Sequence, residues 1–190
     1  MITETDVKNW LKENNKSLFY LWAAQDSLAE DMNLQDLGKL FAEPNEQIAK
    51  DWINAKTILN VKQRDDFDED KDGSGYDLIS MDGSFKIQSK LRAKDLHLEQ
   101  TRRHSKKNIN SGGTGAIVYS VGEADVFMFS RPEIDDYLNI DKWTYIVIPE
   151  SELIDPNNPK YLRPRVNKSL WARYIGRAKE VLETEYGNRK

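Results

Sequence analysis

The chain has 190 residues, a formal net charge of −4, a mean hydropathy of −0.74 and no cysteine. This composition excludes disulfides, thiolate nucleophiles and zinc sites built on cysteine. No apolar run approaches the ~20 residues that a membrane-spanning helix needs, and the first residues are too acidic for a secretory signal. We therefore expect an intracellular, cytoplasmic protein that forms a single domain over residues 1–190 and has no membrane partner.

Four helices and one strand are expected before residue 75. Capping side chains precede apolar residues at helical spacing, and Pro44 is expected to end one helix and begin the next, because proline suits the first helical turn. The expected elements are helices that begin at Thr3, Ser17 and Asn33, a fourth helix at about 45–56, a strand at 57–61 and an acidic loop at 64–75.

The strongest local signal is a hairpin over residues 75–90, in which Asp82-Gly83 joins two alternating runs. A two-residue turn at this pair aligns the strands so that Asp77 faces Gln88. Because side chains alternate between the two faces of a strand, Asp77, Gln88 and Lys90 share one face. The opposite, apolar face carries Tyr76, Leu78, Phe85 and Ile87.

Strands in the middle of the chain with helices on both sides predict an α/β or α+β fold, with a central mixed sheet flanked by helices. We expect a helical N-terminal segment (1–43), a catalytic core (44–150) and a basic, helical C-terminal segment (151–190). The elements expected after the hairpin are a basic helix at about 94–108, a loop at 110–115, paired strands at 116–121 and 125–129, a short helix at 132–138, a strand at 143–148, an irregular segment at 155–167 and a helix at 169–186.

Basic residues are concentrated in two stretches although the whole chain is acidic. Residues 86–107 contain eight Lys or Arg and two acids, and residues 160–190 contain nine against three. Local basic density governs contact with phosphates, so these stretches predict a nucleic-acid partner. The alternative is that each stretch forms the solvated face of a helix.

The polar face of the hairpin suits a magnesium site. A carboxylate from Asp77, the amide oxygen of Gln88 and the backbone carbonyl of Ser89 are the hard oxygen ligands that Mg²⁺ prefers, with Mn²⁺ as a substitute. Lys90 is then expected to orient the attacking water or to stabilise the charge on a phosphate. The alternative is that these side chains form the hydrated face of an ordinary antiparallel hairpin.

Asp77, followed after ten residues by Gln88-Ser89-Lys90, resembles the PD-(D/E)XK nuclease superfamily in the variant where Gln replaces the second acid. The usual proline before the aspartate is absent, and Tyr76 stands there. The stretch is similar to Mrr-like and some type II restriction nucleases over roughly residues 44–121. The resemblance implies a restriction-endonuclease-like core and a further acid, Glu46, as a catalytic and metal-binding residue. Glu46 alternatively serves only as a favourable charge near a helix N-terminus.

The resemblance implies a Mg²⁺-dependent, sequence-specific endonuclease of the type II class that hydrolyses phosphodiester bonds of double-stranded DNA. No ATPase motif is present, and cutting both strands of a palindrome implies a homodimer. Further candidate contacts lie at Arg163, Arg165 and Lys168. The expected DNA-binding residues are Arg92, Lys94, Arg102, Arg103, His104, Ser105, Lys107 and Asn108.

Three other interpretations remain open. The chain is alternatively a structure-specific or repair nuclease with the same fold, or a DNA-binding protein without catalytic activity. Residues 68–73 also resemble the opening of a calcium-binding EF-hand loop. That loop needs a bidentate glutamate at its twelfth position, and Ile79 stands there instead, which disfavours the calcium interpretation.

Overall fold

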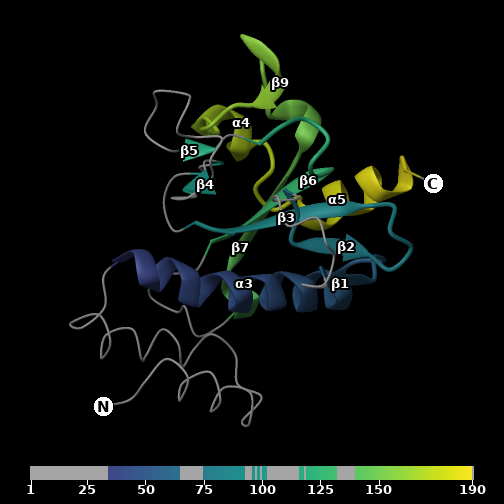
Figure 1. The fold of residues 1–190 in the computed structure, drawn as a ribbon. Coiled ribbons are helices and arrows are strands. Elements are labelled where there is room, and N and C mark those ends of the chain that lie inside the picture. Colours follow the sequence, from purple (N-terminus) through teal and green to yellow (C-terminus); the bar gives the residue numbers. More distant parts are fainter. Residues whose placement is uncertain are drawn as a thin grey trace.

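The structure, a computed structural model, describes residues 34–64, 75–92, 96, 98, 100–101, 116–117, 119–131 and 140–189. It is an α/β fold in which helices pack on a five-stranded mixed sheet (Figure 1). No described helix is long and apolar enough to cross a membrane. The described elements are α3 (Leu34–Lys56), β1 (Val61–Gln63), β2 (Leu78–Ser80), β3 (Lys86–Leu91), β4 (Gln100–Thr101), β5 (Ala116–Ile117), β6 (Val126–Arg131), η2 (Ile140–Lys142), β7 (Thr144–Pro149), η3 (Glu150–Glu152), β8 (Ile154–Asp155), β9 (Asn158–Leu162), α4 (Lys168–Ala172) and α5 (Ala178–Gly187).

The sheet has the strand order β1-β2-β3-β6-β7. Strands β1, β2 and β3 form an antiparallel meander, β6 runs parallel to β3, and β7 is antiparallel to β6. β6 and β7 are almost continuously buried and apolar, as expected for strands covered on both faces. The single parallel pair requires a crossover between β3 and β6, and the residues of this crossover include β4 and β5.

The strand register assigns side chains to two faces of the sheet. Ile87 and Ser89 lie on what we call the helix face, together with Tyr145 of β7. The helix face is covered by α3, where Trp52 stacks on Tyr145 at 4.6 Å between ring centroids. It is also covered by α5, whose Tyr186 ring packs edge-on against the Phe85 ring at 5.8 Å between ring centroids. The core therefore lies between these two helices and the sheet.

The other face, which we call the site face, carries Gln88 and Lys90 beside two phenylalanines of β6. α4 lies over this face, since the guanidinium of Arg131 is 4.8 Å from the ring of Trp171. The short strands β4, β5 and β9 lie on the same side of the sheet as α4 and opposite α3 (Figure 1), and β8 pairs with β9. On the polar face of the hairpin, Gln88 is therefore buried, whereas Asp77 and Lys90 are half-buried.

The expected helix break at Pro44 is wrong, because α3 continues through it. Proline removes one backbone hydrogen bond from a helix interior, at a cost of about 3 kcal/mol. The apolar positions explain why the helix continues. In the sequence, Leu37 and Phe41 before the proline have the same helical spacing as Ile48 and Trp52 after it, which is the pattern of one continuous amphipathic helix. The strand expected at 57–61 begins only at residue 61.

The basic helix expected at 94–108 is wrong over its described residues. Leu96 and Leu98 are both buried, which is the two-residue alternation of an extended chain. Their backbones pair with the segment before α4, through Leu98 N–H to the Pro164 carbonyl at 2.9 Å and Val166 N–H to the Leu96 carbonyl at 2.9 Å. Residues 100–101 then form β4, which pairs with β5.

Three expectations for the second half of the chain also need correction. The segments 116–121 and 125–129 do not pair with each other, because β5 pairs with β4 while β6 inserts between β3 and β7. The segment 155–167 is not irregular throughout, since β8 and β9 form a small hairpin. The single helix expected at 169–186 is two helices, α4 and α5, separated at Gly176, whose φ of +74° interrupts the helix.

The strand expected at 143–148 is confirmed within one residue as β7.

The hairpin register is confirmed, with Leu78 opposite Ile87. The turn itself is longer than two residues. Gly83 donates its N–H to the Ser80 carbonyl at 2.8 Å, and Ser80 N–H bonds to the Phe85 carbonyl at 2.9 Å, so four residues form the loop. The register survives because a two-residue and a four-residue loop both place Ser80 opposite Phe85.

Candidate active site

The site begins where β2 loses its regular pairing with β3. β2 starts at Leu78, and Asp77 lies just outside the ladder. Beyond the end of the β2–β3 ladder, Ser89 N–H donates a hydrogen bond to Asp77 Oδ2 at 2.9 Å instead of to a backbone carbonyl of β2. Gln88 Nε2 donates to the same Oδ2 and to the Ser89 carbonyl, the latter at 3.2 Å. Side chains thus satisfy the backbone groups of Ser89 that face β2.

Two oxygen atoms therefore converge on one donor. The Asp77 Oδ2 and the Ser89 carbonyl both point at the amide nitrogen of Gln88, which is only 5% exposed. Rotation of the amide by half a turn replaces this nitrogen with Gln88 Oε1 and brings together three hard oxygens. Such a donor set fits Mg²⁺ rather than a soft metal. No group of three or more His, Cys, Asp or Glu that suits a metal occurs within the described ranges.

The electrostatics of Asp77 favour a cation. Burial raises the pKa of this carboxyl above its usual value, against the opposing effects of the Lys90 charge, the Ser89 N–H, Arg64 and Gln88. The net direction shows that these partners do not fully compensate the loss of water around the anion. An added positive charge beside Asp77 would supply what the protein groups lack.

Lys90 lies on the same face as Gln88 and is capped by an aromatic ring. Its ammonium is 4.9 Å from the ring centroid of Tyr119, which is buried and packs edge-on against Phe127. Gly75 permits this approach, because a Cβ at that position would lie 2.9 Å from Tyr119 Cδ1. No sequence signal marked Tyr119, since its position over the hairpin depends on the crossover connection.

Arg64 is a second basic residue that the sequence did not indicate. Its N–H bonds to the Asp77 carbonyl at 3.0 Å, and its charge lowers the pKa of Asp77. Its guanidinium lies 5.6 Å from the Tyr76 ring, and the Lys86 ammonium lies 5.1 Å from the same ring. The register of β1 and β2, once known, places residue 64 opposite residue 77. The strand predicted at 57–61 ended too early to reveal this.

α3 contacts the motif strand through Asn45, the neighbour of the predicted Glu46. Asn45 is 2% exposed and donates its Nδ2 to Ser89 Oγ at 2.9 Å. Its Oδ1 is buried and finds no hydrogen-bond partner in the described part of the chain. Glu46 is half-buried at the next position of α3. The role of Glu46 as a metal ligand stays a prediction.

Of the predicted DNA-binding residues, the structure describes Arg92. It is half-buried at the end of β3, donates Nη1 to the Leu91 carbonyl at 2.8 Å, and has its pKa lowered by burial. The acidic loop and the calcium-loop pattern at 68–73 lie outside the described residues. The same holds for Lys94, Arg102, Arg103, His104, Ser105, Lys107 and Asn108.

The chain was compared with protein-family models, with curated proteins and with solved structures, and none of the three comparisons found a match.

Proposed function

We propose that this protein is a Mg²⁺-dependent DNA endonuclease with a restriction-endonuclease-like core. The order of elements supports this proposal. The resemblance predicts a helix, a strand, the hairpin with the motif, a second helix and another strand, and this second helix does not occur among the described residues between the hairpin and β6. α3, β1, the β2–β3 hairpin and β6 follow one another in this order, and β6 is parallel to β3.

The observation that carries the proposal is the convergence of the Asp77 carboxylate and the Ser89 carbonyl on the Gln88 amide, with Lys90 on the same face. An ordinary hydrated hairpin would leave Gln88 in solvent, whereas this amide is buried. Asp77 is half-buried, and desolvation raises its pKa although a lysine lies nearby; such an arrangement is common at functional sites.

The residues divide the chemistry as follows. Asp77, Gln88 Oε1 and the Ser89 carbonyl would hold the metal ion, which would supply positive charge beside the phosphate and lower the pKa of the attacking water. Lys90 contacts the attacking water or a phosphate oxygen and stabilises the negative charge that develops in the transition state. Asn45 holds Ser89 in place through its side chain. Glu46 is the further acid that we propose near the metal.

The proposed substrate is double-stranded DNA, and the proposed assembly is a homodimer of the type II restriction class. A dimer presents two copies of the site to the two strands of a palindrome. Arg92 and the basic residues that follow it are the proposed DNA contacts.

Incubation of supercoiled plasmid with the protein and Mg²⁺, and with EDTA as the control, tests the proposal. We expect discrete linear fragments from wild type, and intact plasmid with EDTA or with Asp77→Ala. Lys90→Met should also abolish cleavage but leave a gel shift with DNA, while the exposed Lys160→Met should change neither result. Smeared or branch-dependent products would instead indicate the repair-nuclease alternative.

One observation favours a second candidate, a DNA-binding protein without catalysis. The Gln88 amide directs its nitrogen, a hydrogen-bond donor, at the Asp77 carboxylate, whereas a metal ligand would direct its oxygen there. If wild type shifts all DNA substrates on a gel and leaves every one intact with Mg²⁺ or Mn²⁺, the nuclease proposal fails and this candidate replaces it.

A further inference from the structure

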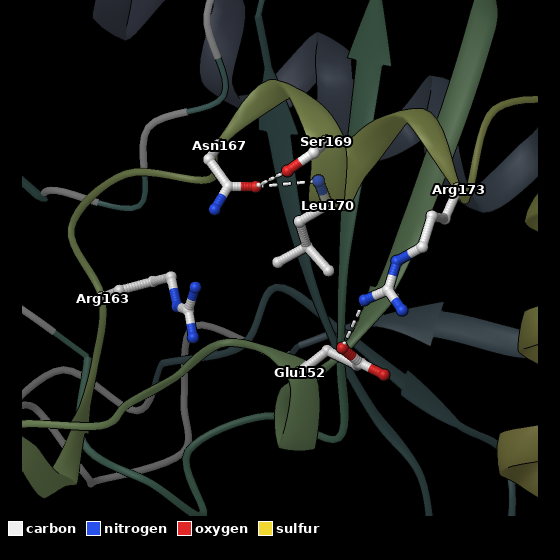
Figure 2. A pocket seen from close by; sticks show the side chains of 6 residues that line it. All are labelled: Glu152, Arg163, Asn167, Ser169, Leu170 and Arg173. Atoms are coloured by element: carbon white, nitrogen blue, oxygen red, sulfur yellow. Dashed lines mark hydrogen bonds and ion pairs between the residues drawn. The ribbon is translucent and has the colours of Figure 1, made fainter.

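A cavity of about 400 Å³ opens between α4 and the segment around η3 and β9, and Figure 2 shows its walls. Its volume lies within the roughly 300–1,000 Å³ of small-molecule sites. Hydrogen-bond donors dominate, since two arginines, an asparagine and a serine outnumber one carboxylate. The lining residues are Glu152, Arg163, Asn167, Ser169, Leu170 and Arg173.

Arg163 has a buried donor without a partner. Its Nη2 donates to the Ile154 carbonyl at 3.1 Å, which fixes one side of the guanidinium. Its Nε is buried and makes no hydrogen bond within the described ranges, where Arg163 also forms no ion pair. A partly buried guanidinium with an unsatisfied N–H is costly, and an anion in the cavity would remove this cost.

Asn167 presents a second donor. Its Oδ1 accepts hydrogen bonds from Leu170 N–H at 2.8 Å and from Ser169 Oγ at 3.0 Å, and so caps α4. These bonds fix the orientation of the amide, and its nitrogen lies on the cavity side, toward Arg163 (Figure 2). The donor is therefore held in place before any ligand arrives.

Arg173 lies on the opposite wall, where it pairs with Glu152 at 2.7 Å. Both partners are exposed, 58% and 39%, so this ion pair contributes little and yields readily to a competing anion. With two arginines and one glutamate, the lining carries a net charge of +1. Donors that approach from several directions suit a tetrahedral oxyanion better than a planar carboxylate.

We propose that this cavity binds a phosphate group through Arg163, the Asn167 amide and Arg173. The phosphate belongs either to the end of a nucleic-acid strand or to a free nucleotide or inorganic phosphate. The proposal does not depend on nuclease activity, because binding is measured without cleavage.

Calorimetric titration of the whole protein in EDTA tests this proposal. The probes are inorganic phosphate, a mononucleotide, and one oligonucleotide with either a 5′-phosphate or a 5′-hydroxyl. Asn167→Asp retains the capping oxygen but places a negative charge in the cavity, and should weaken phosphate binding by roughly tenfold or more. Arg163→Gln should have a similar effect. Lys56→Gln removes one positive charge from an exposed position outside the cavity and outside both basic stretches, and should leave binding unchanged.

Preference for the 5′-phosphorylated oligonucleotide supports the proposal and identifies a strand end as the ligand. Equal binding of both oligonucleotides, with saturable binding of phosphate or nucleotide that Asn167→Asp weakens, supports it and identifies a free phosphate compound. Absence of saturable phosphate binding by wild type, or binding that Asn167→Asp and Arg163→Gln leave intact, overturns it. Circular dichroism verifies that each variant is folded.

Discussion

The two ends of the β2–β3 hairpin each hold one aspartate, and the pKa values of the two carboxyls are shifted in opposite directions. At the turn, Asp82 is exposed and accepts hydrogen bonds from Ser80 Oγ at 2.6 Å and from Ser84 Oγ at 2.8 Å. These hydrogen bonds hold the pKa of Asp82 well below its usual range, and the bond from Ser80 has the largest effect. At the open end, Asp77 accepts two hydrogen bonds against the four that Asp82 accepts, and burial raises the pKa of Asp77.

The difference shows that hydrogen bonds alone do not decide the state of a carboxyl. Both aspartates have donors, and the one that has lost water remains incompletely stabilised as an anion. Asp82 is therefore a structural group that holds the turn. Asp77 is a destabilised anion that a cation would stabilise, which is the property expected of a metal ligand.

The largest expected effect is on the rate of DNA cleavage, and it distinguishes Asp77 from Asp82. Asp77→Asn should reduce the rate of plasmid cleavage with Mg²⁺ by about 10³-fold or more, because the amide carries no charge for the metal. Asp82→Asn is the matched control and should leave the rate within about twofold of wild type, since nothing at the turn enters the proposed chemistry. Equal losses in both variants would contradict the division of roles.

The next effect concerns the metal. Gln88→Glu places a second carboxylate beside Asp77 and should raise the affinity for Mn²⁺ by roughly tenfold, or about 1.4 kcal/mol, measured by calorimetry. Without metal the same change should lower the Tm, because two buried carboxylates repel each other. Asn158→Asp makes the same chemical change at an exposed position. An unaltered Mn²⁺ affinity in Gln88→Glu would count against the metal site.

A smaller effect tests the turn. Gly83 has a φ of +75°, and no atom lies within 4 Å of a Cβ added there. Gly83→Ala should therefore lower the free energy of unfolding by roughly 1–2 kcal/mol through backbone conformation alone. Gly187→Ala, at the end of α5 and without positive φ, is the control and should be close to neutral. Chemical denaturation measures both, and equal effects would refute the conformational explanation.

The smallest effect is on the pH dependence of stability. The folded pKa of Asp82 is lowered, so its contribution is present above the unfolded pKa and is lost as the pH falls through the folded one. The folded pKa of Asp77 is raised, so its contribution is present below the unfolded pKa and is lost as the pH rises through the folded one.

Thermal unfolding across an acid-to-neutral pH series measures these two contributions. At neutral pH, Asp82→Asn should have a lower Tm than wild type, and the difference should shrink toward acid pH. Asp77→Asn should gain Tm relative to wild type as the pH rises. Parallel pH profiles for the two variants would show that burial does not distinguish the two aspartates.

Local sequence patterns were sufficient to predict those features in which a residue interacts with its neighbours in the chain. The alternation of residues 75–90 predicts the register of Leu78 and Ile87, and the apolar run near residue 145 predicts β7. The candidate groups Asp77, Gln88 and Lys90 share a region because the register follows from the hairpin itself. These features depend on the periodicity of side chains and on the backbone preferences of glycine.

Pairings between distant segments could not be predicted from such patterns. The buried, alternating Leu96 and Leu98 pair with the chain before α4, although their basic neighbours suggested a helix. α3 continues through Pro44, although proline removes one hydrogen bond from a helix interior.

The sequence alone determined which chemical groups the hairpin carries and which of them face each other. Only the tertiary structure decided that Gln88 is buried, that Tyr119 covers Lys90, and that Arg64 lies beside Asp77. The physical reason is that desolvation depends on everything that packs around a group, including segments far away in the chain. The same burial that separates Asp77 from Asp82 is therefore a property of the fold and not of the motif.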